Sequence, residues 1–216
     1  MIRRPPRSTP SNSSAASDVY KRQKQCRREG EKLFLKGERC FGPMCALTRR
    51  QTPPGQHGAS RSRRRLSEYG GQLRAKQKVK RFYGILEKPF KNYYHKALRS
   101  RGSTGEALLT MLERRLDNVC YLLGWGLSRA QARQLIGQGK IMVNSKKVTS
   151  PSFSVRPGDK LEFKGGEEQL RKVDKVPAWL KTVSKDSLKA NVVKNPQRED
   201  VTVEVDEQLI VEFYSR

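Results

Sequence analysis

Acidic residues and histidines are scarce in this chain of 216 residues. Lys and Arg number 46 against 21 Asp and Glu, and the two histidines are His57 and His95. The sequence shows no phosphate-binding loop, no nucleophile elbow and no metal-hydrolase helix. With so few general acid–base candidates and none of these motifs, we expect that the protein is not an enzyme.

Long apolar runs are also missing, and hydrophobic residues make up 35% of the chain. No run approaches the length that crosses a bilayer, and no apolar region marks a secretion signal. We therefore expect a cytoplasmic protein without a membrane partner. In that reducing compartment the four cysteines are expected to be free thiols and not a disulfide framework.

The chain does have a large excess of positive charge, with a formal net charge of +25. Such an excess repels itself unless a polyanion neutralises it, and nucleic acid is the commonest such partner. An anionic membrane surface is the second candidate. Because the charge is spread over several segments and not gathered on one amphipathic helix, nucleic acid is favoured.

Residues 1–23, MIRRPPRSTPSNSSAASDVYKRQ, differ from the rest of the chain. They are rich in Pro, Ser and Arg and have almost no apolar periodicity, which is typical of a disordered basic arm. The string also resembles translated sequencing-adapter read-through. We expect residues 1–23 to be disordered and foreign to the native protein.

Apolar spacing predicts several helices and short strands. Helices are expected over 61–84, about 90–101, 104–123 and 128–139, with Thr104 capping the third and Ser128 with Gln131 forming a capping box for the fourth. Strands are expected at 141–143, around Val148, at 161–163 and at 201–205. The predicted fold is α+β and helix-dominated: a helical lobe plus a small RNA-binding module of helices packed on a short antiparallel sheet.

The predicted organisation has three folded parts after residues 1–23. Residues 24–113 are expected to form a helical nucleic-acid-binding lobe with a cysteine-containing loop, and residues 114–178 a nucleic-acid-binding module. Residues 179–216 are expected to pack back on the helical lobe, since this tail is acidic relative to the rest.

The candidate RNA contacts are mostly arginines and lysines. Arg129 and Arg133 are four residues apart and share a helical face, and the planar guanidinium can donate two hydrogen bonds to one phosphate. Structured RNA is recognised mainly through its shape, phosphates and 2′-hydroxyls, so no base-reading motif is required. The predicted RNA-binding set is Arg49, Arg50, Gln56, His57, Arg61, Arg63, Arg64, Arg65, Arg74, Lys78, Arg81, Arg114, Arg115, Arg129, Arg133, Lys140, Asn144, Lys146, Lys147 and Arg156.

Four segments resemble a known family. Residues 114–118 (RRLDN), 128–136 (SRAQARQLI), 139–144 (GKIMVN) and 155–159 (VRPGD) are similar to a small RNA-binding module that also occurs in pseudouridine synthases, tyrosyl-tRNA synthetases and heat-shock proteins. The flanks, which are residues 26–40, the PPGQHG stretch, the helix over 73–84 and residues 207–216, resemble the bacterial small ribosomal subunit protein four family. The resemblance covers about residues 24–216.

That resemblance implies a structural constituent of the small ribosomal subunit. It implies a primary binder of the 16S rRNA 5′ domain that nucleates assembly of the subunit body and supports translational accuracy. The implied partners are 16S ribosomal RNA, the neighbouring small-subunit protein five and the protein's own messenger RNA.

Two alternatives lead to different expectations. An RNA-modifying enzyme that borrows the module needs a second, catalytic domain, and about fifty residues after position 165 are too few for one. A general nucleic-acid chaperone would bind duplex DNA and random RNA about equally.

Cys26, Cys40 and Cys45 have the spacing C-x13-C-x4-C. Some members of the resembled family carry a fourth cysteine three residues before the first, where this chain has Gln23. Structural zinc normally takes four ligands. One hypothesis is that the native protein supplies the missing cysteine and binds zinc; the other is that three small buried residues pack in a metal-free fold. Cys120 is expected to be a core residue.

Overall fold

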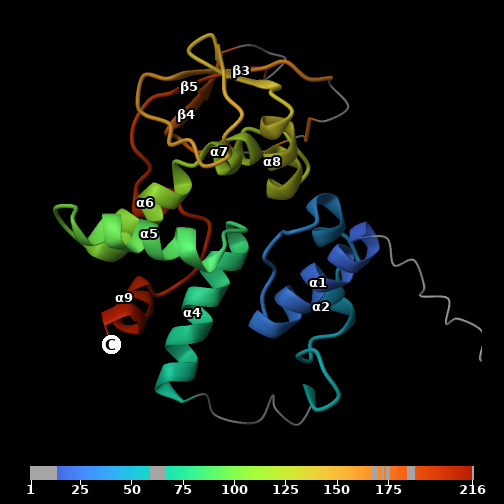
Figure 1. The fold of residues 1–216 in the computed structure, drawn as a ribbon. Coiled ribbons are helices and arrows are strands. Elements are labelled where there is room, and N and C mark those ends of the chain that lie inside the picture. Colours follow the sequence, from blue (N-terminus) through green and yellow to red (C-terminus); the bar gives the residue numbers. More distant parts are fainter. Residues whose placement is uncertain are drawn as a thin grey trace, which may run out of the picture.

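The computed structural model describes residues 14–58, 67–166, 170, 171, 173, 176–183 and 188–215. It confirms an α+β, helix-dominated fold (Figure 1). The elements are α1 Ser14–Glu29, η1 Gly37–Cys40, α2 Ala46–Arg49, α4 Glu68–Phe82, α5 Glu87–Leu98, α6 Thr104–Glu113, α7 Leu116–Leu122, α8 Arg129–Gly137, β1 Ile141–Val143, β2 Lys146–Lys147, β3 Lys160–Phe163, β4 Leu180–Thr182, β5 Lys189–Val192, η3 Arg198–Asp200 and α9 Glu207–Ser215.

Helix α1 begins inside the segment that we expected to be disordered. Residues 1–13 lie outside the described part, but residues 14–23 are helical, so the predicted disorder is wrong for them. The stretch after Ser14 is free of Pro and Gly and contains Ala, Lys, Arg and Gln, which favour helix. The helix ends at Gly30, which has a φ of +76° and donates its N–H to the Cys26 carbonyl at 2.9 Å.

The helical lobe packs α4, α5 and α6 with the C-terminal helix α9. Val79, Phe90, Leu112 and Ile210 are fully buried in its core. Of the helix predicted over 61–84, α4 begins at Glu68, because Ser67 is extended and its hydroxyl caps Gly70 N–H at 3.2 Å. Residues 59–66 lie outside the described part.

Glu87 on α5 forms hydrogen bonds to both α4 and α9. Its carboxylate accepts hydrogen bonds from Lys76 at 2.7 Å, from Lys80 at 2.8 Å and from the Tyr214 hydroxyl of α9 at 2.8 Å. Partial burial alone would raise the pKa of the Glu87 carboxyl, but these three donors outweigh it and lower the pKa to about 2. Glu87 is therefore ionised at neutral pH and fastens α9 to α4.

The single helix predicted over 104–123 is broken at Arg114 and Arg115, which corrects the expectation. Leu116 N–H donates to Phe153 O at 2.8 Å, and Arg114 O accepts from Val155 N–H at 2.9 Å. The 151–155 loop therefore supplies the hydrogen-bond partners that a continuous helix would have supplied. The N-cap of α6 is Ser103, whose hydroxyl accepts from Glu106 N–H at 3.5 Å, and not Thr104. Leucine spacing alone cannot show such a break.

The module contains a five-stranded antiparallel sheet in the order β2-β1-β3-β5-β4. Asn144 and Ser145 have φ values of +49° and +64°, as a tight hairpin turn between β1 and β2 requires. Half of the predicted capping box is present: Ser128 caps Gln131 N–H at 3.3 Å, but the Gln131 side chain accepts from Leu127 N–H at 2.7 Å, one residue before the Ser128 N–H that a capping box requires. Helices α7 and α8 cover one face of the sheet (Figure 1).

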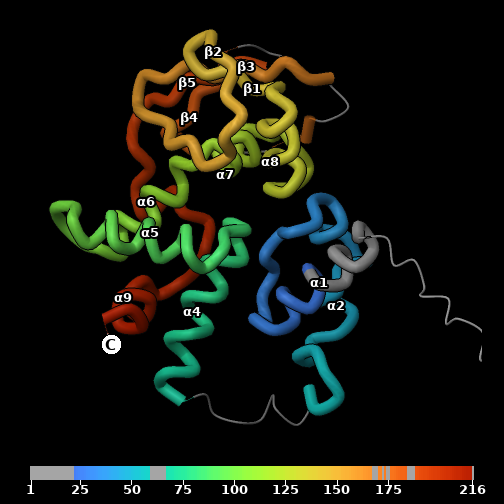
Figure 2. Tube along the Cα trace, viewed as in Figure 1, coloured from blue at the N-terminus to red at the C-terminus, as the bar shows by residue number. Residues whose placement is uncertain are grey.

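The predicted boundary at residue 178 is wrong. Strands β4 and β5 belong to the module sheet, and Trp179, Leu180, Ala190 and Val192 lie in its core. Only the last part of the tail returns to the helical lobe (Figure 2). Val201, Val203 and Ile210 are buried there in the core of that lobe. The predicted strand at 201–205 is not formed, because this extended segment pairs with none of the described strands.

Candidate nucleic-acid interface

The first exposed basic group lies at the outer edge of the module sheet. Lys146 and Lys147 are exposed on β2, Arg156 is exposed in the following loop, and Lys140 is half-buried before β1. Asn144, also predicted, has a structural role: its amide nitrogen donates to Asp159 Oδ1 at 2.8 Å and its oxygen accepts from Lys160 N–H at 2.9 Å. These bonds hold two turns together and present the lysines at a fixed edge.

A second exposed group follows the cysteine loop. Arg49, Arg50, Gln56 and His57 are all exposed between α2 and Gly58. The backbone here is tightly packed, because a Cβ on Gly58 would lie 2.0 Å from the Pro53 carbonyl oxygen. Four further predicted contacts, Arg61, Arg63, Arg64 and Arg65, lie outside the described residues.

Three predicted contacts on α4 instead form ion pairs within the chain. Arg74 and Arg81 both contact the buried carboxylate of Glu29, the former at 3.2 Å, and Lys78 contacts Glu31 at 2.5 Å. These side chains neutralise acids of α1 and of the residues that follow it, and their contact with RNA stays a prediction. Helical spacing of cations did not reveal which of them face acids on another element.

Asp117 is the centre of a buried polar cluster between the lobes, which we call the hub. Its carboxylate is 2% exposed and accepts from Arg115 at 2.8 Å and from Arg133 at 2.6 Å. Arg133 also donates to the carbonyls of Tyr83 at 3.1 Å and Gly84 at 2.8 Å. Arg115 also donates to the Tyr93 hydroxyl of α5 at 2.8 Å.

Arg129 was expected on an RNA-facing helix surface, and that placement is wrong. It is 6% exposed, and its guanidinium lies 3.8 Å from the centroid of Phe82 and 4.4 Å from that of Tyr121. Its Nε donates to Asn118 Oδ1 at 2.8 Å. Burial lowers the pKa of Arg129, although the neighbouring Tyr121 and Glu113 act against that shift. The side chain joins the two lobes and presents little surface to an RNA backbone.

Glu113 completes the hub. It accepts from the Tyr83 hydroxyl and from Asn118 Nδ2, each at 2.6 Å. Burial raises the pKa of the Glu113 carboxyl and, more strongly, that of the Tyr83 hydroxyl. Arg114, another predicted contact, also has an internal partner, since its Nε donates to Val155 O at 2.8 Å. Together these bonds fix the orientation of one lobe against the other.

A groove with a volume of about 420 Å³ opens beside the hub. Its lining comes from both lobes and includes Tyr93 and Lys96 of α5, Arg115, Arg133 and Ser152. The groove thus crosses the junction of the lobes, and its lining includes the basic side chains of Lys96, Arg115 and Arg133.

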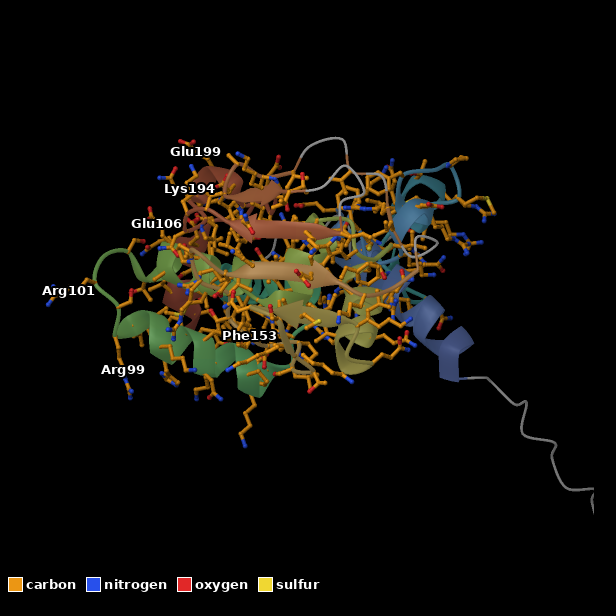
Figure 3. The ribbon with its side chains drawn as sticks, turned by 90° about the horizontal axis from the view of Figure 1, so that it is seen from above. Arg99, Arg101, Glu106, Phe153, Lys194 and Glu199 are labelled. Atoms are coloured by element: carbon orange, nitrogen blue, oxygen red, sulfur yellow. The ribbon has the colours of Figure 1, made fainter. Side chains whose placement is uncertain are left out.

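The predicted set missed the outer face of α5. Lys88, Lys91, His95, Lys96 and Arg99 are all exposed there, while Phe90, Tyr94 and Ala97 face the core. Figure 3 shows Arg99 and Arg101 pointing away from the protein. The signal was present as cations three and four residues apart, opposite an apolar stripe.

The three candidate zinc ligands converge but do not form a metal site. Cys26, Cys40 and Cys45 are buried around one small cavity, which Gln23 also lines. Burial raises the pKa of the Cys26 and Cys40 thiols. Within the described residues, no group of three or more Cys, His, Asp or Glu is arranged to hold a metal ion. Three thiols also fall short of the four ligands of structural zinc, and Cys120 is fully buried in the module core.

Among the described residues, no helix combines the length and the apolar character needed to cross a bilayer.

Comparison with known proteins gives two consecutive matches. A family model described as the ribosomal protein S4/S9 N-terminal domain matches residues 19–113, and one described as the S4 domain matches residues 114–161. The first match begins inside the segment that we expected to be foreign.

Three curated relatives match over nearly their whole length. Small ribosomal subunit protein uS4 of Dictyoglomus turgidum is 52% identical over 200 residues, covering 88% of this chain and 95% of the relative. The uS4 protein of Thermodesulfovibrio yellowstonii is 50% identical with the same coverage. That of Desulforamulus reducens is 50% identical over 202 residues, covering 89% and 96%. The chain therefore belongs to the small ribosomal subunit protein uS4 family.

Proposed function

We propose that this chain is a structural component of the small ribosomal subunit in the cytoplasm, and that it binds the 5′ domain of 16S rRNA directly, nucleates assembly of the subunit body and supports translational accuracy. Small-subunit protein five and the chain's own messenger RNA are the further partners in this proposal. The uS4 family is structural and non-enzymatic, so no catalytic role is assigned.

The main support for the proposal is the groove at the junction of the two lobes, whose lining includes basic side chains. The hub fixes the orientation of one lobe against the other. Lys96 on one side and Arg115 and Arg133 on the other line the groove. Further exposed cations lie on β2 of the module and on α5 of the helical lobe. Because the hub holds the lobes in one orientation, little ordering free energy is lost on binding, and both lobes contact one folded RNA together.

The test is a salt series of filter-binding measurements with the 16S 5′ domain, a shuffled RNA and duplex DNA. In the triple variant Lys146→Gln, Lys147→Gln, Arg156→Gln, we expect weaker binding to the 5′ domain and a shallower log–log salt slope. Each lost phosphate contact should reduce the slope by about 0.7–0.9. The control variant Lys181→Gln, Lys194→Gln changes exposed lysines outside the predicted set and should leave the slope unchanged.

Two results contradict the proposal. Equal affinity of the unaltered chain for all three nucleic acids indicates a general chaperone. An unchanged slope in the triple variant removes the sheet edge from the RNA-binding surface.

We also propose that the native protein binds structural zinc through a fourth cysteine at the position of Gln23. Gln23 and Cys26 are three residues apart on α1 and line the same cavity as Cys40 and Cys45. A zinc ion held by four thiolates would cross-link α1 to the cysteine loop.

The variant Gln23→Cys is expected to bind about one zinc ion per chain, because it completes a four-thiolate set. It should also gain stability when zinc is added. Metal content by mass spectrometry and thermal unfolding with and without zinc measure both effects. The control is Gln25→Cys, which places the thiol on the same helix but not at this cavity. No bound zinc in Gln23→Cys contradicts the proposal.

A further inference from the structure

An exposed aromatic pair stands out in the loop between α1 and α2. The Phe41 side chain is 60% exposed, although most large apolar side chains of the described residues are buried. Its ring stacks on that of Phe34, with centroids 5.0 Å apart and an interplanar angle of 30°. One face of Phe41 is thus supported by protein, which leaves a flat apolar surface open to solvent.

The loop that carries this pair is held in a fixed place. Phe34 has a φ of +49°, a backbone conformation that a bulky side chain rarely adopts and that persists where the surrounding structure enforces it. Next to it, Leu33 is buried in the helical core. Gly37 lies against the module, since a Cβ there would be 2.5 Å from the Leu127 carbonyl oxygen. The loop between Phe34 and Phe41 is therefore held against the segment that precedes α8.

Exposed arginines occur close to Phe41 in the sequence. Arg39, Arg49 and Arg50 are exposed in the same short segment, against the exposed Glu38. Arg39 donates to the Met44 carbonyl at 3.4 Å, which closes the turn that follows Phe41. Cations beside an open aromatic face are the combination with which proteins hold unpaired nucleotides: the ring stacks on the base and the cations neutralise its phosphates.

We propose that Phe41, supported by Phe34, is a stacking site for one unpaired base of the bound RNA. Arg39, Arg49 and Arg50 neutralise the phosphates on either side of that nucleotide. This inference rests on the proposed function and adds the kind of nucleotide that the loop recognises. A neighbouring protein would find the same apolar ring, but the excess of arginines over acids favours a polyanion.

The test uses the full chain and a transcript of the 16S 5′ domain. In Phe41→Leu, we expect affinity to fall by about fivefold to a hundredfold through loss of one base–aromatic stack. The salt slope should stay unchanged, since no phosphate contact is removed. Phe41→Tyr keeps the ring and should bind as tightly as the unaltered chain. Ultraviolet crosslinking followed by peptide mass spectrometry should join Phe41 to a single nucleotide, and Phe41→Leu should lose that crosslink.

The matched control is Tyr69→Leu. Tyr69 is 51% exposed, and its ring also contacts a second ring, that of Phe213, with centroids 5.7 Å apart. Unlike Phe41, it lies at the start of α4. Its loss should leave RNA affinity unchanged. If Phe41→Leu binds RNA with normal affinity, the stacking site is wrong and the proposed function still stands. The exposed Phe41 ring is then a contact for a neighbouring protein. Failure of the unaltered chain to bind the 5′ domain selectively overturns both.

Discussion

Replacing Asp117 by asparagine is expected to lower the free energy of unfolding by about 3 kcal/mol, and the melting temperature by about 6–12 °C. The substitution keeps the shape of the side chain but removes the charge that both Arg115 and Arg133 face. Arg115 is then buried beside a neutral amide, and the loss of one partner from a buried ion pair leaves an uncompensated charge. Arg133 keeps two backbone carbonyl acceptors, which places the effect at the low end of the usual range.

The matched control is Glu162→Gln, which removes a surface ion pair. Glu162 and Lys189 are 3.2 Å apart on adjacent strands, with side chains 32% and 59% exposed. An exposed pair contributes at most about 1 kcal/mol. Urea unfolding of both variants measures the difference. If Asp117→Asn costs no more than Glu162→Gln, the hub does not hold the lobes together.

Replacing Trp179 by alanine is expected to cost about 3–5 kcal/mol of folding free energy. Trp179 is fully buried in the module core, and its carbonyl accepts from Val193 N–H at 2.9 Å. The substitution removes a large apolar surface under the β4–β5 edge of the sheet and leaves a cavity. Hydrogen exchange should become faster in β3 and β5 and remain unchanged in α4 and α5, because the loss is confined to the module.

Val183→Ala serves as the control, since Val183 follows β4 and its side chain is 59% exposed. Its effect on the unfolding free energy should lie within about 0.5 kcal/mol of zero. If hydrogen exchange instead becomes faster in α4 and α9 after Trp179→Ala, then Trp179 stabilises the helical lobe. That result would contradict its place in the module core and would support our first expectation from the sequence.

Local sequence signals predicted the module well. Ser128 caps α8, and β1 spans the expected residues 141–143, because each depends on residues within a few positions of one another. The break between α6 and α7 could not be predicted in this way. It depends on carbonyls of the 151–155 loop, which lie far along the chain from Leu116.

The candidate site was predicted less well, for a related reason. A cation on an exposed helix face and a cation facing a buried acid have the same sequence pattern. Arg129 lies between the rings of Phe82 and Tyr121, and Arg81 meets Glu29; these partners become neighbours only in the folded chain. Lys146 and Lys147 lie in a two-residue edge strand after a tight turn, where local sequence already favours exposure.

The path of the chain has a consequence for the order of folding during synthesis. The polypeptide leaves the helical lobe after α6, builds the whole module, and returns so that α9 packs against α4. Gln72 on α4 and Glu212 on α9, which are joined by a hydrogen bond of 3.0 Å, are 140 positions apart. The translating ribosome delivers α9 after the strands of the module, so the module can fold before α9 packs on the helical lobe. Helices α4 and α6 are made before the module, but they are covered by α9 only after the module has been synthesised.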